Sequence, residues 1–193
     1  MRELFIIVSS LLALISPLVY SGAILKGQAR PHRTTRFVLL LITTLTTASL
    51  FAAGDRVAIW LAAVSTLQSV VIFTLSLKYG MGGWARSDLV CLITAVIGII
   101  MWQTTRNPVY GLYFAIAADF TGMIPALIKT YRFPYTEIYQ FYLLDVFAAG
   151  FNMLALTDFS FSAFSYPLYI MLINLVMVFL VIRPANTGKQ AAE

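Results

Sequence analysis

The sequence predicts an all-α integral membrane protein with seven transmembrane helices in a three-plus-one-plus-three arrangement. Three observations carry this prediction: the composition, the number of long apolar segments, and an internal repeat. Of the 193 residues, 60% are hydrophobic and only 11% are charged, and the mean hydropathy is +0.86. This composition provides too little polar surface to cover a water-soluble core.

Seven apolar segments come close to the roughly 17–25 residues that a helix needs to cross a bilayer. The first follows Arg2, as in a signal peptide, but its length and the basic residues after it favour a retained helix. Asp55, Asp88 and Asp158 are expected to cap the N-termini of the third, fourth and seventh segments. The seven segments are residues 4–25, 37–53, 57–78, 88–103, 108–129, 137–156 and 164–182.

The basic residues predict the orientation in the membrane. Ten of the Lys and Arg residues fall on one side, in loops 26–36, 78–86 and 129–132 and in the C-terminal tail, and three fall on the other. This bias places the N-terminus outside and the C-terminus in the cytoplasm, in a plasma or inner membrane. Loop 26–36 is expected to contact anionic headgroups, with His32 at the interface. Lys129 is expected to anchor the end of its segment.

An internal repeat joins the first and last thirds of the chain. Shifting the chain by 103 residues aligns three positions and the apolar segments that follow them. Because this shift skips an even number of segments, both copies have the same orientation. The fourth segment has no counterpart and serves as a linker. The aligned pairs are Lys26 with Lys129, Pro31 with Pro134, and Asp55 with Asp158.

With this repeat and its prolines, the chain resembles the SWEET sugar-transporter and PQ-loop superfamily. Pro17 and Pro125 lie in the first segment of each copy, and Pro31 and Pro134 at the entrance to the second. The resemblance implies that these prolines are hinges for alternating access between two triple-helix bundles, residues 1–79 and 107–183. Residues 80–106 would form the linker helix and 184–193 a cytoplasmic tail. The chain departs from the family in having no Pro-Gln dipeptide.

Two carboxylates near the middle of apolar segments are the candidate functional groups. An unpaired charge at the bilayer centre costs roughly 2.5–3.5 kcal/mol, so Asp119 and Asp145 should face a cavity and a partner. Small residues recur at helical spacing beside each, as in Asp145, Ala149 and Asn152. Such acids suit proton coupling. The alternative is a structural role, with both carboxylates hydrogen-bonded inside the protein.

We expect the site to combine residues from both copies near the bilayer midplane. SWEET pockets place an asparagine in the third helix of each copy; Asn174 fits this role, whereas Val71 occupies the aligned position. Asp119, Asp145 and Asn174 are expected to converge, with Ser16 and either Gln68 or Ser69 opposite. Depth follows from the helical rise, but rotation about each helix does not.

Three classes of function remain open. The first is an alternating-access transporter of a small polar solute such as a sugar, which the repeat, the prolines and the two acids favour. The second is a receptor or sorting protein of the same fold, as KDEL receptors are. The third is an intramembrane enzyme, for which Asp119 and Asp145 would be the catalytic pair; we expect no enzyme. One His and one Cys predict no metal site or cofactor, and the expected partners are solute, lipid or another copy, not nucleic acid.

Overall fold

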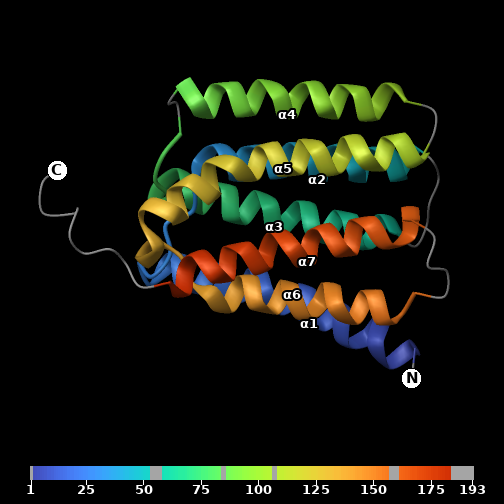
Figure 1. The fold of residues 1–193 in the computed structure, drawn as a ribbon, viewed down its shortest axis with the longest axis horizontal. Coiled ribbons are helices and arrows are strands. Elements are labelled where there is room, and N and C mark those ends of the chain that lie inside the picture. The colour runs from blue at the N-terminus through green and yellow to red at the C-terminus, as the bar shows by residue number, and fades with distance from the viewer. Residues whose placement is uncertain (1, 53–57, 84–85, 106–107, 157–160, 184–193) are drawn as a thin grey trace, which may run out of the picture.

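A computed structural model describes residues 2–52, 58–83, 86–105, 108–156 and 161–183. These residues fold as seven α-helices that run side by side along one long axis (Figure 1). No strand occurs among them beyond a single bridge between His32 and Met81. Their order is α1 (Arg2–Leu25), α2 (Arg33–Ala52), α3 (Ala58–Tyr79), α4 (Arg86–Thr104), α5 (Pro108–Arg132), the 3-10 helix η1 (Pro134–Thr136), α6 (Tyr139–Leu154) and α7 (Phe161–Ile182).

The predicted segments correspond to these helices, with differences at the ends. Helix α2 begins at Arg33, four residues before the apolar run, because a helix can continue through a polar turn that hydropathy does not mark. Helix α4 begins at Arg86, so Asp88 lies in its first turn and is not its N-cap. Asp55 and Asp158, the other predicted caps, lie outside the described residues.

The helices form two sets with the same internal order. Helix α3 contacts both α1 and α2, and α7 contacts both α5 and α6. Among the described residues, no backbone of α1 approaches α2 within 8 Å between Cα atoms, and the same holds for α5 and α6. The third helix of each set therefore lies between the other two. The sets meet where α1 packs on α6 and α2 packs on α5, and α4 covers α5 and α2 at one edge (Figure 1).

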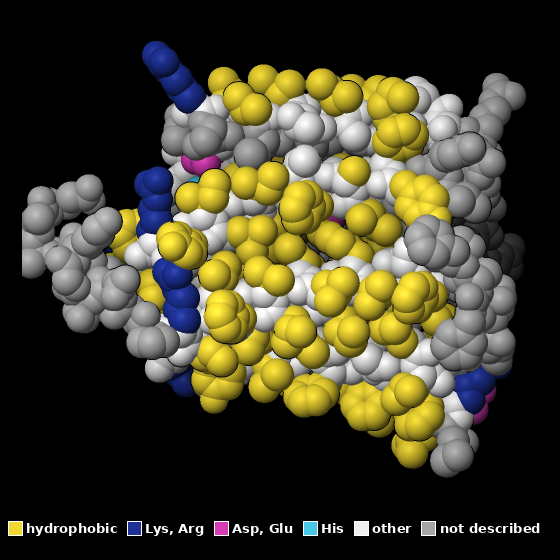
Figure 2. All heavy atoms as spheres, in the orientation of Figure 1, with side chains coloured by type: hydrophobic (Ala, Val, Ile, Leu, Met, Phe, Trp, Pro, Cys, Tyr) yellow, Lys and Arg dark blue, Asp and Glu magenta, His cyan; other side chains and the backbone are white. Residues whose placement is uncertain are grey.

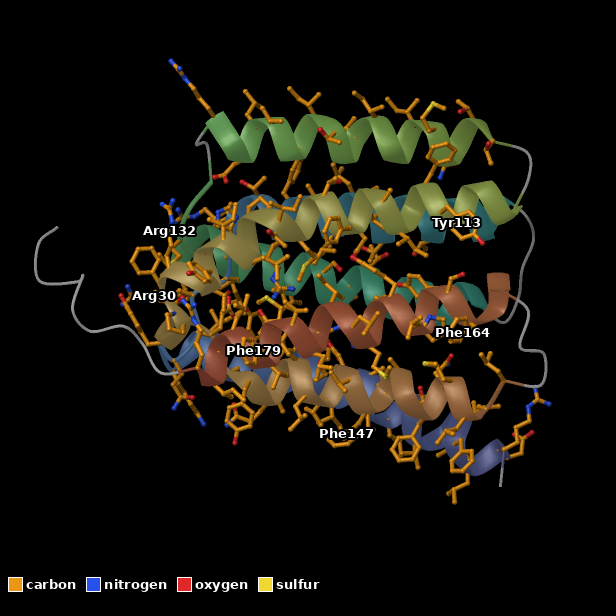
Figure 3. The ribbon with its side chains drawn as sticks, in the orientation of Figure 1. Arg30, Tyr113, Arg132, Phe147, Phe164 and Phe179 are labelled. Carbon is orange, nitrogen blue, oxygen red and sulfur yellow. The ribbon has the colours of Figure 1, made fainter. Side chains whose placement is uncertain are left out.

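Much of the outer surface is apolar. Figure 2 shows hydrophobic side chains across the middle of one face, and most of its Lys and Arg side chains gather at one end. Helix α1 and the Phe164–Ile182 part of α7 are long and apolar enough to cross a membrane, and only 22% of each span is buried. Phe147 of α6 is half exposed and points away from the other helices (Figure 3).

A core of buried hydrophobic residues lies at the basic end of the protein. The aromatic rings of Tyr20 and Phe141 stack with their centroids 4.3 Å apart, and Tyr142 packs edge-on beside them. Ile24 and Met177 complete a cluster from α1, α6 and α7 that is closed to solvent. Arg30 and Arg132 lie at this end, and Tyr113 and Phe164 lie at the opposite one (Figure 3).

The turn between α3 and α4 requires glycine, and its substitution gives a stability prediction. Gly82 has a φ of 71°, and a Cβ there would lie 2.3 Å from the His32 Nε2 atom. Gly27 has a similar φ of 73° but nothing within 4 Å of its Cβ position. We expect Gly82→Ala to lower the free energy of unfolding by about 2–3 kcal/mol and Gly27→Ala by about 1 kcal/mol. Thermal unfolding followed by helical circular dichroism measures both, and equal losses would contradict the His32 contact.

Candidate functional site

A cavity of about 160 Å³ lies among α2, α5, α6 and α7. Three of the predicted site residues, Asp119, Asp145 and Asn174, line it together. Arg36 of α2 lines the same cavity, so its wall contains charges of both signs. The remaining lining residues are Leu39, Met123, Phe141, Tyr142, Ile170 and Ile173.

Asp119 is held from the neighbouring helix. The Tyr169 hydroxyl of α7 donates a hydrogen bond to its Oδ2 atom. One turn along α5, Gly122 faces Val38, and a Cβ on Gly122 would lie 2.5 Å from the Val38 Cγ1 atom. The small residue that the sequence placed beside Asp119 therefore permits the close approach of α2 to α5.

Asp145 lines two cavities. The second, of about 270 Å³, lies toward the opposite end of the molecule and is lined by Ser9, Asn152 and Tyr166, among others. Asp145 and Ile170 are the two residues that both cavities share. Ala149 and Asn152 also line the second cavity, so the predicted small-residue face of α6 borders this cavity.

Of the other predicted site residues, some lie in or beside the first cavity and others line neither cavity. Asn174 is buried, and its Nδ2 atom donates to the Ile170 carbonyl at 2.9 Å, so its own helix holds one end of the amide. Ser16 is fully buried, donates to the Phe141 carbonyl at 3.3 Å and faces the Asp145 carboxylate. Gln68 and Ser69 are half-buried on α3 and line neither cavity.

The four predicted hinge prolines line neither cavity. Pro17 and Pro125 are inside α1 and α5. Pro31 is buried in the loop before α2, where its carbonyl accepts from Met81 N at 3.0 Å, and Pro134 begins η1. Their hinge role stays a prediction. Pro167, inside α7, is a proline that the sequence reasoning did not consider, and it lines the second cavity.

Arg36 is the main residue of the candidate site that the sequence does not single out. The sequence groups it with loop 26–36, which is expected to contact headgroups, but it lies in the first turn of α2 and lines the cavity. Its guanidinium carbon is 4.6 Å from the Tyr20 ring centroid and 5.5 Å from that of Phe141. Stacking on aromatic faces orients the guanidinium while leaving its in-plane donors available. Its place directly before the apolar run that begins at Phe37 was the only signal in the sequence.

A buried ion pair closes the basic end of the protein, and it corrects the prediction for Lys129. That residue does not anchor a helix end at the surface; it is 5% exposed, and its Nζ atom donates to the Glu137 carboxylate and to the Arg30 carbonyl. The other Glu137 oxygen accepts from the hydroxyls of Tyr20 at 2.8 Å and Tyr142 at 3.0 Å. The Lys129–Glu137 cluster thus connects α1 and the loop after it with α5 and α6.

His32 is buried, not interfacial as predicted. It is 5% exposed, and its Nε2 atom lies 3.6 Å from the Asp88 carboxylate, which also accepts from Gly83 N at 3.1 Å. Burial lowers the pKa of His32, and nearby Asp88 opposes that shift only in part. The pair fastens the α1–α2 loop to the start of α4.

Comparison with protein-family models, curated proteins and solved structures found no match to this chain. The cavities and the groups that line them are therefore the features of this protein that bear on its function.

Proposed function

We propose that this protein is a seven-span membrane transporter that moves a small polar solute by alternating access between two triple-helix bundles. The bundles are α1–α3 and α5–α7, with α4 as the linker, and the basic end faces the cytoplasm. One observation carries the proposal: two cavities extend from Asp145 and Ile170 toward opposite ends of the molecule. Such a layout suits a solute that passes a central barrier.

The contacts between helices support the bundle arrangement. Each set of three has its third helix in the middle, and exchanging the sets converts the α1–α6 contact into the α5–α2 contact. This is the pairing expected of two like-oriented repeats around an axis along the membrane normal. The exposed apolar side chains and the basic end support a membrane location and its orientation.

The closed state of the basic end supports the direction of access. The Lys129–Glu137 cluster and the stacked rings of Tyr20 and Phe141 fill that end beside the first cavity. The second cavity lies on the far side of Asp145. In this conformation a solute would enter from the outer side, and opening to the cytoplasm would require the contacts between the bundles at the basic end to separate.

Flux through reconstituted protein tests the proposal. Purified protein in liposomes is supplied with a panel of radiolabelled sugars, amino acids and organic cations, and uptake is measured against protein-free liposomes. We expect saturable uptake of at least one solute and its loss in Gly122→Leu, because that side chain would hold α2 away from α5. Gly22→Ala is the control, since its Cβ would meet nothing within 4 Å. Uptake of every solute at the protein-free level would argue against transport.

A further inference from the structure

The charges around the first cavity are not matched with one another. Arg36, Asp119 and Asp145 line the same space, yet among the described residues none of them forms an ion pair. Asp119 accepts the Tyr169 hydroxyl, Asp145 interacts with the Ser16 hydroxyl, and Arg36 stacks on the Tyr20 ring, so the direct partners of all three groups are neutral. Buried charges are stabilised by partners of opposite charge. The cavity therefore favours a solute that carries both a positive and a negative group.

Arg36 and Asp145 line one cavity of about 160 Å³. Arg36 lies over the Phe141 ring, and Asp145 follows Phe141 by about one turn of α6. A small solute inside this cavity can form charge-assisted hydrogen bonds with both groups. A cation alone would leave Arg36 unpaired, an anion alone would leave Asp145 unpaired, and a sugar would leave both.

The other lining residues limit the size and polarity of the part of the solute that contacts neither Arg36 nor Asp145. Leu39, Met123 and Ile173 supply an apolar side to the cavity. Its volume of about 160 Å³ is close to that of an engineered cavity, about 150 Å³, that binds benzene. A short, uncharged side chain therefore fits, and a long or charged one does not.

We propose that the cavity binds a small neutral α-amino acid, with its carboxylate on Arg36, its ammonium on Asp145 and its side chain against the apolar wall. This inference rests on the proposed transport function and names the chemical class of its substrate. Asn174 is placed to hydrogen-bond to the same solute from α7.

Equilibrium binding to purified protein in lipid nanodiscs tests the proposal without requiring transport. The probes are L-valine, L-valine methyl ester, which lacks the carboxylate charge, and isovalerate, which lacks the amine. We expect the wild type to bind L-valine roughly 10- to 100-fold more tightly than either analogue, as expected for one lost charge-assisted hydrogen bond. Equal affinity for L-valine and its ester would overturn the proposal. A lack of competition between these two ligands for the same site would also overturn it.

Two variants assign the charges to their residues. Arg36→Gln should weaken L-valine to the level of the ester and leave the ester unchanged, whereas Asp145→Asn should remove the preference over isovalerate. Exposed Lys78 and Glu3 provide matched controls, because Lys78→Gln and Glu3→Gln change the same charges outside the cavity. If Arg36→Gln does not fold, Arg36→Lys keeps the charge, and the ligand comparison in the wild type decides the question alone.

The two proposals fail in different ways. Binding of L-valine without flux of any solute would overturn transport and keep the amino-acid site. Saturable flux of glucose in protein that does not bind L-valine would keep transport and overturn the amino-acid site.

Discussion

Replacing Lys129 with methionine is expected to lower the free energy of unfolding by about 3–5 kcal/mol, the cost of leaving a buried charge without its partner. Glu137 is 5% exposed and would keep only two tyrosine hydroxyls around its carboxylate. The Arg30 carbonyl would also lose its donor. Thermal unfolding in detergent, followed by helical circular dichroism, measures the loss.

The double variant Lys129→Met/Glu137→Gln separates the buried charge from simple packing. A neutral glutamine can still accept from Tyr20 and Tyr142, so the pair of changes should cost less than Lys129→Met alone. Lys78→Met is the control, because Lys78 is exposed and its loss should stay within about 0.5 kcal/mol. A cost below 1 kcal/mol for Lys129→Met, or no recovery in the double variant, would contradict a structural ion pair.

Asp119→Asn is expected to preserve the fold and to remove most of the uptake that a proton gradient drives. The asparagine keeps the shape of the side chain and can still accept the Tyr169 hydroxyl, but it can no longer gain or lose a proton. The measurement is uptake of the transported solute into liposomes with and without an inwardly directed pH gradient. We expect the gradient-driven part to fall close to the uptake measured without a gradient, because an amide cannot bind and release the coupled proton.

Tyr169→Phe distinguishes proton coupling from a structural hydrogen bond. It removes the donor to Asp119 but leaves the carboxylate in the cavity, so gradient-driven uptake should persist. Glu3→Gln, at an exposed carboxylate, should leave uptake unchanged. Full gradient-driven uptake in Asp119→Asn, with Tyr169→Phe as the more damaging change, would assign Asp119 a structural role.

The sequence by itself determined where the helices lie and which acids are unusual. Long apolar segments must hydrogen-bond their backbones internally, so their length and position predict helices directly. Asp119, Asp145 and Asn174 lie well inside such segments, and they do line one cavity. The periodicity of Asp145, Ala149 and Asn152 also identified the face of α6 that lines the second cavity. The position of each segment and the small-residue face of α6 depend on one helix at a time, whereas the convergence of the three residues depends on how α5, α6 and α7 pack.

Only the tertiary structure decided which basic residues turn inward. The 103-residue shift gave Lys26 and Lys129 the same role, yet Lys26 is exposed and Lys129 is buried. The shift also aligns Thr34 with Glu137, so the first copy has no carboxylate at the position where the second supplies the partner of Lys129. Arg36 likewise gains its place from the stacked rings of Tyr20 and Phe141, which come from α1 and α6. The sequence around a basic residue at a helix end does not show whether its side chain contacts headgroups or turns inward. That outcome depends on a partner that belongs to another helix.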